Sequence, residues 1–130
     1  MLNTNPEFFA EKGYCLFPDV LESQEIGTLR QMLDAALATP LPYIAESHRR
    51  DPGALDRPGY LGEPHARDLA WLEICRHPRI VDAVEAVLGP NLILVFSSVF
   101  IKQPFDLTEV AWHQDNSYWP SVHGTDVVTV

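Results

Sequence analysis

The sequence predicts one α+β domain in which helices come first and strands follow. Apolar residues recur at spacings of three and four before residue 90, and β-branched and aromatic residues are dense after it. That order is typical of α+β domains. The chain has 130 residues, the size of a single domain, and its 46% hydrophobic content is enough for a core.

Two helices are expected in the first 40 residues. Pro6 is suited to the first position of a short helix, and Gly13 to a left-handed cap at its end. Residues 14–17 then predict a brief strand. Ser23 is expected to be the N-cap of a second, amphipathic helix that Pro40 ends. Its apolar stripe consists of Ile26, Leu29, Leu33 and Leu37.

The middle of the chain predicts a long loop and two more helices. Residues 40–66 are rich in proline and glycine, which indicates an irregular loop. A helix is expected over residues 68–76, with Trp71 in the core. Another is expected to begin at Pro78 and to end at Gly89 and the proline after it.

Strands are expected after residue 91. Leu92 to Lys102 has β-branched and aromatic residues on both alternating sets, which predicts a strand covered on both faces. Shorter strands are expected at residues 112–115 and 127–130, on either side of a turn-rich stretch.

Charge and cysteine content exclude several classes of protein. The chain has 18 acidic and 9 basic residues, and a net charge of -9 disfavours nucleic acid and membrane surfaces as partners. Cys15 and Cys75 lie far apart without C-x-x-C spacing, which argues against a zinc site or a disulfide framework. No signal peptide pattern opens the chain, so a cytoplasmic protein is expected.

The chemistry is concentrated in WHQDNSYWP, residues 112–120. On a strand, His113 and Asp115 share one face while Gln114 faces the other way. An imidazole and a carboxylate at this spacing supply two of the three ligands of a non-haem Fe(II) facial triad. The alternative is a hydrogen-bonded structural pair in a small acidic binding module.

The surrounding sequence resembles the phytanoyl-CoA dioxygenase family of Fe(II)- and 2-oxoglutarate-dependent oxygenases. The motifs that carry the resemblance are FFAEKGYCLFPDVLESQEIGTLRQML, Gly89-Pro90-Asn91 before a strand ending in Lys102, and the segment WHQDNSYWP. The resemblance implies a helical prelude over residues 1–91. Residues 92–130 would be the first core strands of a double-stranded β-helix of the jelly-roll or cupin type.

The resemblance also implies roles for single residues. His113 and Asp115 would bind iron, and the substrate would be a small organic molecule, with 2-oxoglutarate and dioxygen as cosubstrates. Because Asp115 keeps its carboxylate, hydroxylation is favoured over halogenation. The resemblance further implies that Gln114 and Ser98 contact 2-oxoglutarate, and that Tyr118 and Trp119 border the substrate pocket.

In that family the second histidine ligand and the arginine that binds 2-oxoglutarate lie well beyond the H-x-D motif. Residues 1–130 are therefore expected to be one truncated oxygenase domain with little or no turnover alone. The alternative is a non-catalytic fragment, or a subunit whose barrel a second chain completes. The other histidines and the exposed basic residues are expected to be solvated or capping; they are His48, Arg49, Arg50, His65, His77, Lys102 and His123.

Overall fold

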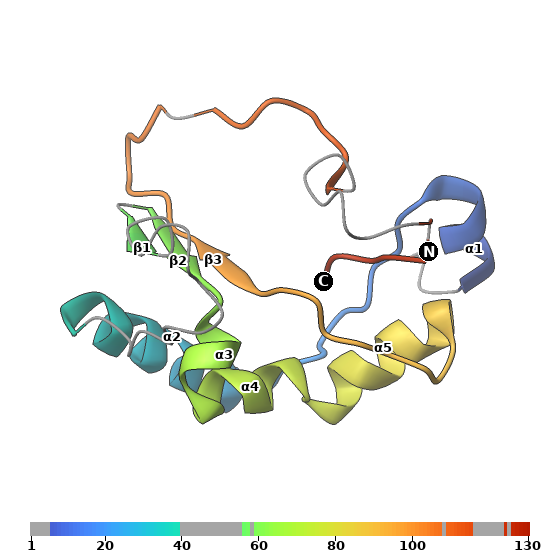
Figure 1. Cartoon of the computed structure of the whole chain (residues 1–130), viewed down its shortest axis with the longest axis horizontal. Helices are drawn as coiled ribbons and strands as arrows, with labels where there is room; N and C mark the ends of the chain where they lie inside the picture. The colour runs from blue at the N-terminus through green and yellow to red at the C-terminus, as the bar shows by residue number, and fades with distance from the viewer. Residues whose placement is uncertain (1–5, 40–55, 58, 108, 116–123, 125) are drawn as a thin grey trace.

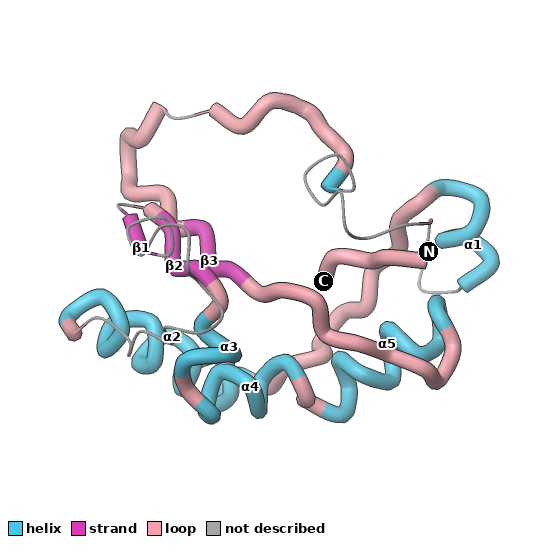
Figure 2. The backbone as a smooth tube through the Cα atoms, in the orientation of Figure 1, coloured by secondary structure: helices cyan, strands magenta, loops and turns pink. Residues whose placement is uncertain are grey.

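The computed structural model describes residues 6–39, 56–57, 59–107, 109–115, 124 and 126–130. Helices α2 to α5 follow one side of the molecule, a small sheet lies beside α2 and α3, and the chain after the sheet arches away from both (Figures 1 and 2). This mixture of helices and antiparallel strands agrees with the predicted α+β class. The helices are α1 (Pro6–Lys12), α2 (Ser23–Ala38), α3 (Pro64–Arg67), α4 (Leu69–Cys75) and α5 (Pro78–Leu88).

Proline and glycine delimit the two helices α1 and α5 as predicted. Gly13 has φ +78°, and its amide donates to the Phe9 carbonyl at 2.7 Å. Gly89 has φ +84°, and its amide donates to the Glu85 carbonyl at 2.7 Å. Both glycines adopt a conformation that costs other residues steric energy, so each ends its helix at a defined position.

Helix α2 begins with a capping box. Its N-cap is Glu22, whose amide donates to the Glu25 carboxylate at 2.7 Å. The prediction of Ser23 as the N-cap is therefore wrong by one residue. The reciprocal bonds of a capping box satisfy amides that the first turn leaves open, and here a glutamate takes the place usually held by serine.

The sheet has three short antiparallel strands in the order β1-β2-β3. They are β1 (Asp56–Arg57), β2 (Tyr60–Gly62) and β3 (Ser98–Phe100), with Leu61 opposite Val99. The first two lie in the segment of residues 40–66 predicted to be an irregular loop, so that prediction is wrong for residues 56–57 and 60–62, and also for residues 64–66, which belong to α3. Gly59, at φ +81°, makes the turn between them.

The predicted strands are mostly absent from the described residues. The long strand over 92–102 is confirmed only at β3, and residues 14–17, 112–115 and 127–130 form no ladder with a neighbour. The reason is physical, because a strand exists only when another strand accepts its backbone hydrogen bonds. Local β propensity cannot supply that partner.

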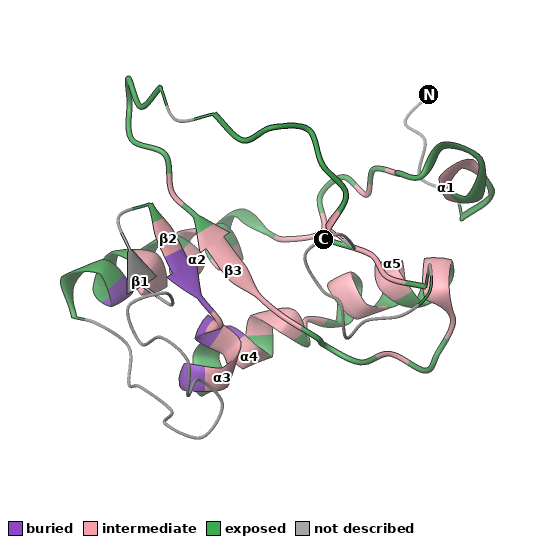
Figure 3. Cartoon of the chain, turned by 45° about the horizontal axis from the view of Figure 1, so that its top comes forward, coloured by how far each residue is buried: buried purple, intermediate pink, exposed green. Residues whose placement is uncertain are grey.

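The core lies where α2, β2 and α4 meet (Figure 3). Its buried residues Ala36, Leu61 and Trp71 are 7%, 3% and 8% exposed, which confirms the prediction for Trp71. Arg67 is also buried, and its guanidinium donates to the Gly62 carbonyl at 3.1 Å. The partly buried residues around this core are Leu29, Met32, Leu33 and Val99.

Outside this core many large apolar side chains meet solvent. Ile93 is 87% exposed and Val95 is 52% exposed, so the prediction of a strand covered on both faces is wrong for the described residues. Trp112 is fully exposed. Among the described residues, no helix combines the length and apolar character needed to cross a membrane.

Candidate functional site

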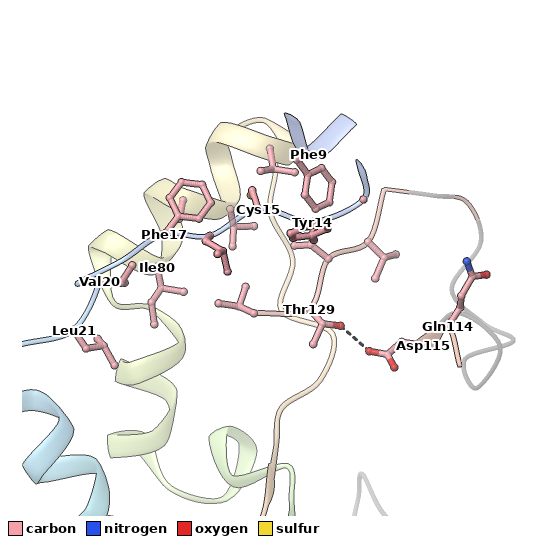
Figure 4. A pocket seen from close by; sticks show the side chains of 18 of the residues that line it. Phe9, Tyr14, Cys15, Phe17, Val20, Leu21, Ile80, Gln114, Asp115 and Thr129 are labelled. Atoms are coloured by element: carbon pink, nitrogen blue, oxygen red, sulfur yellow. Dashed lines mark hydrogen bonds between the residues drawn. The ribbon is translucent and has the colours of Figure 1, made fainter. Parts of the chain in front are cut away.

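The H-x-D segment borders a hollow of about 900 Å³. Helix α1, the chain that follows it, helix α5 and residues 127–130 surround this hollow, and the close view shows Asp115 directed toward Thr129 (Figure 4). Most of the wall is apolar, which suits contact with hydrocarbon, and the hollow is open to solvent on one side. The apolar residues that line it include Phe9, Phe17, Ile80, Val84 and Val87.

His113 and Asp115 lie together at the edge of this hollow. The Nε2 atom of His113 is 3.2 Å from Oδ1 of Asp115. The Nδ1 atom of His113 is 2.7 Å from the Ala111 carbonyl oxygen, which accepts a hydrogen bond from it. The side chains are 32% and 39% exposed, so both reach solvent as well as the hollow.

A third residue orients the carboxylate. The hydroxyl of Thr129 donates to Oδ2 of Asp115 at 2.7 Å (Figure 4). The other carboxylate oxygen, Oδ1, is the one that lies near His113. Sequence reasoning missed Thr129. The signal that could have found it is a single hydroxyl within the apolar run Val127–Val130, at a position where every neighbour is valine.

The donor set suits a divalent metal. Metal bonds to imidazole nitrogen and carboxylate oxygen are about 2.0–2.2 Å long, so two donors 3.2 Å apart can contact one ion. A carbonyl bound at Nδ1 fixes the proton on that nitrogen and leaves Nε2 available for coordination. Within the described ranges, no group of three or more His, Cys, Asp or Glu side chains is arranged to hold a metal ion.

The other residues that the sequence predicted for the site do not all lie at the hollow. Gln114 is exposed and borders the hollow, where it points in a different direction from Asp115 (Figure 4). Ser98 lies in β3 opposite Gly62, and it is not among the residues that line the hollow. Tyr118 and Trp119 lie outside the described residues, as do His48, Arg49, Arg50 and His123.

Two further histidines have polar partners away from the hollow. The Nδ1 atom of His65 is 2.6 Å from the Ser97 hydroxyl. His77 occupies the N-cap position of α5, yet its Nε2 atom contacts the Glu25 carboxylate at 2.9 Å instead of capping the helix. His77 therefore links α5 to α2, and the side chain is only 14% exposed.

An ionic cluster strengthens that link. The Arg79 guanidinium lies 2.7 Å from the Glu22 carboxylate and 3.9 Å from that of Glu25. The Glu22 amide, then the hydrogen bond from His77, lower the pKa of Glu25. Arg79 also donates to the Asp19 carbonyl at 3.4 Å. Because α5 forms one wall of the hollow, these contacts link that wall to α2.

The two cysteines carry free thiols. Burial raises the pKa of the Cys75 thiol, and a hydrogen bond with Ser97 opposes that rise in part. Cys15 borders the hollow and is partly exposed.

Comparison with known proteins gives one match. The family model of phytanoyl-CoA dioxygenase (PhyH) matches residues 9–130, which include α2 to α5, the ionic cluster, the sheet and the H-x-D segment. No curated protein and no solved structure matches the chain. Because the match extends over nearly the whole chain, the chain belongs to the phytanoyl-CoA dioxygenase family.

Proposed function

We propose that this chain is part of an Fe(II)- and 2-oxoglutarate-dependent dioxygenase that hydroxylates a small organic substrate. The observation that carries the proposal is the 3.2 Å separation of His113 Nε2 and Asp115 Oδ1 beside an apolar hollow, in a member of this family. In this proposal residues 92–130 are the first strands of a double-stranded β-helix.

The metal and its cosubstrates would supply the oxidising power, as members of the family are generally Fe(II)- and 2-oxoglutarate-dependent. His113 and Asp115 hold the metal and transfer no proton. Thr129 keeps the carboxylate of Asp115 turned toward the imidazole. The retained carboxylate of Asp115 favours hydroxylation over halogenation, since it occupies the position that a halide would need.

The remaining family positions complete the proposed site. Gln114 and Ser98 would contact 2-oxoglutarate, and Tyr118 and Trp119 would border the substrate. The apolar wall formed by α1 and α5 would receive the hydrocarbon part of the substrate and keep water from it. A cytoplasmic location belongs to the same proposal.

The third ligand and the arginine for 2-oxoglutarate are proposed to come from outside residues 1–130, from further residues or from a second chain. Two protein ligands bind a metal weakly, and without the arginine the cosubstrate loses its charged anchor. Residues 1–130 alone are therefore proposed to release little or no succinate. Measurable succinate from this chain by itself would contradict that proposal.

The test is an anaerobic Fe(II) titration followed calorimetrically. The unmodified chain is expected to bind iron, and His113→Ala and Asp115→Ala are each expected to weaken that binding by about tenfold or more. Glu109→Ala is the matched control, because it removes an exposed carboxylate from the same segment. Equal affinity in all four proteins would exclude an iron site at the H-x-D motif.

The same titration distinguishes the proposed iron site from the alternative, in which this chain is a small acidic binding module. That alternative predicts that the His113 and Asp115 variants change the free energy of unfolding and leave metal content unchanged. The agreement of residues 9–130 with one oxygenase family favours the metal site.

A further inference from the structure

Three polar side chains from separate parts of the chain meet beside the start of β3, and none of them lines the hollow. The Nδ1 atom of His65, in α3, is 2.6 Å from the Ser97 hydroxyl oxygen. The thiol of Cys75, at the end of α4, is hydrogen-bonded to the same hydroxyl. The Ser97 carbonyl accepts a further hydrogen bond from the Glu63 amide at 2.9 Å. A thiol, a hydroxyl and an imidazole are therefore joined in one chain of hydrogen bonds.

The thiol sets the direction of these hydrogen bonds. Burial raises the pKa of the Cys75 thiol, so the sulfur keeps its proton at neutral pH and acts as the donor. The Ser97 oxygen then accepts from the thiol, and its own proton is donated to Nδ1 of His65. The chain of hydrogen bonds thus ends at a ring nitrogen that can accept a proton. A thiol needs such an acceptor to react, because only the thiolate is strongly nucleophilic.

We propose that Cys75 is a modification site for peroxides, with His65 acting through Ser97 as the acceptor of the thiol proton. The thiol proton passes to the Ser97 oxygen while the hydroxyl proton of Ser97 passes to Nδ1 of His65. The thiolate sulfur then attacks a peroxide oxygen, so that an S–O bond forms and the O–O bond breaks. The leaving hydroxide takes up the proton that His65 releases, which gives water. Cys75 is oxidised to a sulfenic acid and the peroxide is reduced.

Access and charge stabilisation both suit this chemistry. Cys75 and His65 are partly exposed, so a small oxidant can reach the sulfur. After the proton transfer the Ser97 hydroxyl donates to the thiolate and stabilises it, and the same bond already opposes the raised pKa of the thiol. Because Ser97 directly precedes β3, oxidation of Cys75 changes a contact that anchors this strand to α4. The proposal is independent of iron and of 2-oxoglutarate.

Oxidation by hydrogen peroxide, followed by intact-mass spectrometry, tests the proposal. Cys15→Ser leaves Cys75 as the only thiol, since the chain has two cysteines. In that background, dimedone is expected to trap the sulfenic acid of Cys75 as it forms. His65→Gln and Ser97→Ala are each expected to lower the labelling rate by about tenfold or more. The double variant is expected to be no slower than either single variant, because both changes interrupt the same proton path.

Two controls separate proton transfer from altered packing. Ser97→Thr keeps the hydroxyl and is expected to retain the labelling rate. Cys75→Ser leaves only Cys15, which borders the hollow, and adding His65→Gln to that chain is expected to leave its labelling unchanged. In denaturing urea, all the chains that keep Cys75 are expected to react equally. Equal rates with and without His65 in the folded chain, additive losses in the double variant, or a folded Cys75 that peroxide does not label would overturn the proposal.

Discussion

Trp71 and Trp112 mark two regions of this chain that are stabilised in different ways. Trp71 is 8% exposed and lies in the core shared by α2, β2 and α4. Trp112 is fully exposed, one residue before the candidate metal ligand His113. The first region has apolar burial and the ionic cluster of α2 and α5, whereas the second has single polar contacts at the H-x-D segment.

The two regions have different roles: the region around Trp71 stabilises the fold, and the H-x-D segment positions side chains of the candidate site. Burial of large side chains contributes most of the free energy of folding, so the region around Trp71 determines whether the chain folds. The contacts of His113, Asp115 and Thr129 lie near the surface and contribute little to that free energy. Their effect is on the orientation of two donor atoms.

The sharpest contrast is expected between the two tryptophans. Trp71→Ala removes a buried indole and leaves a cavity, so it is expected to lower the free energy of unfolding by about 3–5 kcal/mol. Trp112→Ala removes a solvent-exposed indole and is expected to change it by less than about 0.5 kcal/mol. Urea unfolding followed by circular dichroism measures both. Similar losses for the two variants would remove the distinction between the regions.

A hydroxyl deletion tests whether the second region serves the metal. Thr129→Val is expected to weaken Fe(II) binding about 10- to 100-fold, because the Asp115 carboxylate loses its orienting bond. Anaerobic calorimetric titration gives the affinity, and urea unfolding should remain nearly unchanged. Thr129→Ser keeps the hydroxyl and is the control, so equal weakening by serine would point to packing instead.

The turn at Gly59 precedes the core strand β2, and a substitution there is expected to give a smaller effect. Gly59→Ala is expected to destabilise the chain by about 1–2 kcal/mol, because alanine is disfavoured at φ +81° and its Cβ would meet the Ile101 carbonyl at 3.0 Å. Gly27→Ala is the control within α2, where nothing lies within 4 Å of the added Cβ. It is expected to stabilise by about 0.5–1 kcal/mol. Thermal unfolding distinguishes the two signs.

Acid should weaken the contacts that Glu25 makes between α2 and α5. Hydrogen bonds from the Glu22 amide and His77 lower the pKa of Glu25 from its ordinary value of 4.5. A lowered pKa in the folded state contributes stability that is present above pH 4.5 and is lost as the pH falls through the lowered value. Glu25→Gln is expected to flatten this part of the pH profile of unfolding. An unchanged slope between pH 5 and pH 3 would contradict it.

The helices were the part of the fold that local sequence could predict. Pro6, Gly13, Pro78 and Gly89 act through their own backbone restrictions, so their positions carry the same meaning in any surroundings. One exception, Glu22 in place of Ser23 as N-cap, differs by one residue and depends on which carboxylate completes the capping box. The other is the short helix α3, which begins within the segment predicted to be a loop.

Strands could not be predicted in the same way, because their partners are remote in sequence. β2 was overlooked in a segment rich in proline and glycine, and its partner β3 lies more than thirty residues later. The opposite error occurred at residues 92–97, where strong β propensity meets no neighbouring strand among the described residues. His113 and Asp115 were expected to share one face of a strand; the structure brings them together without a strand at residues 112–115. Thr129 was not predictable, since 14 residues separate it from Asp115.

The core around Trp71 has a consequence for biosynthesis. Its buried residues and most of their neighbours precede residue 90, as does the ionic cluster of Glu22, Glu25, His77 and Arg79. During translation this region can therefore pack as soon as α5 has left the ribosome, before the uncharged segment of residues 92–101 has been synthesised. The β-prone segment would then emerge beside a folded surface, to which β2 offers a pairing partner.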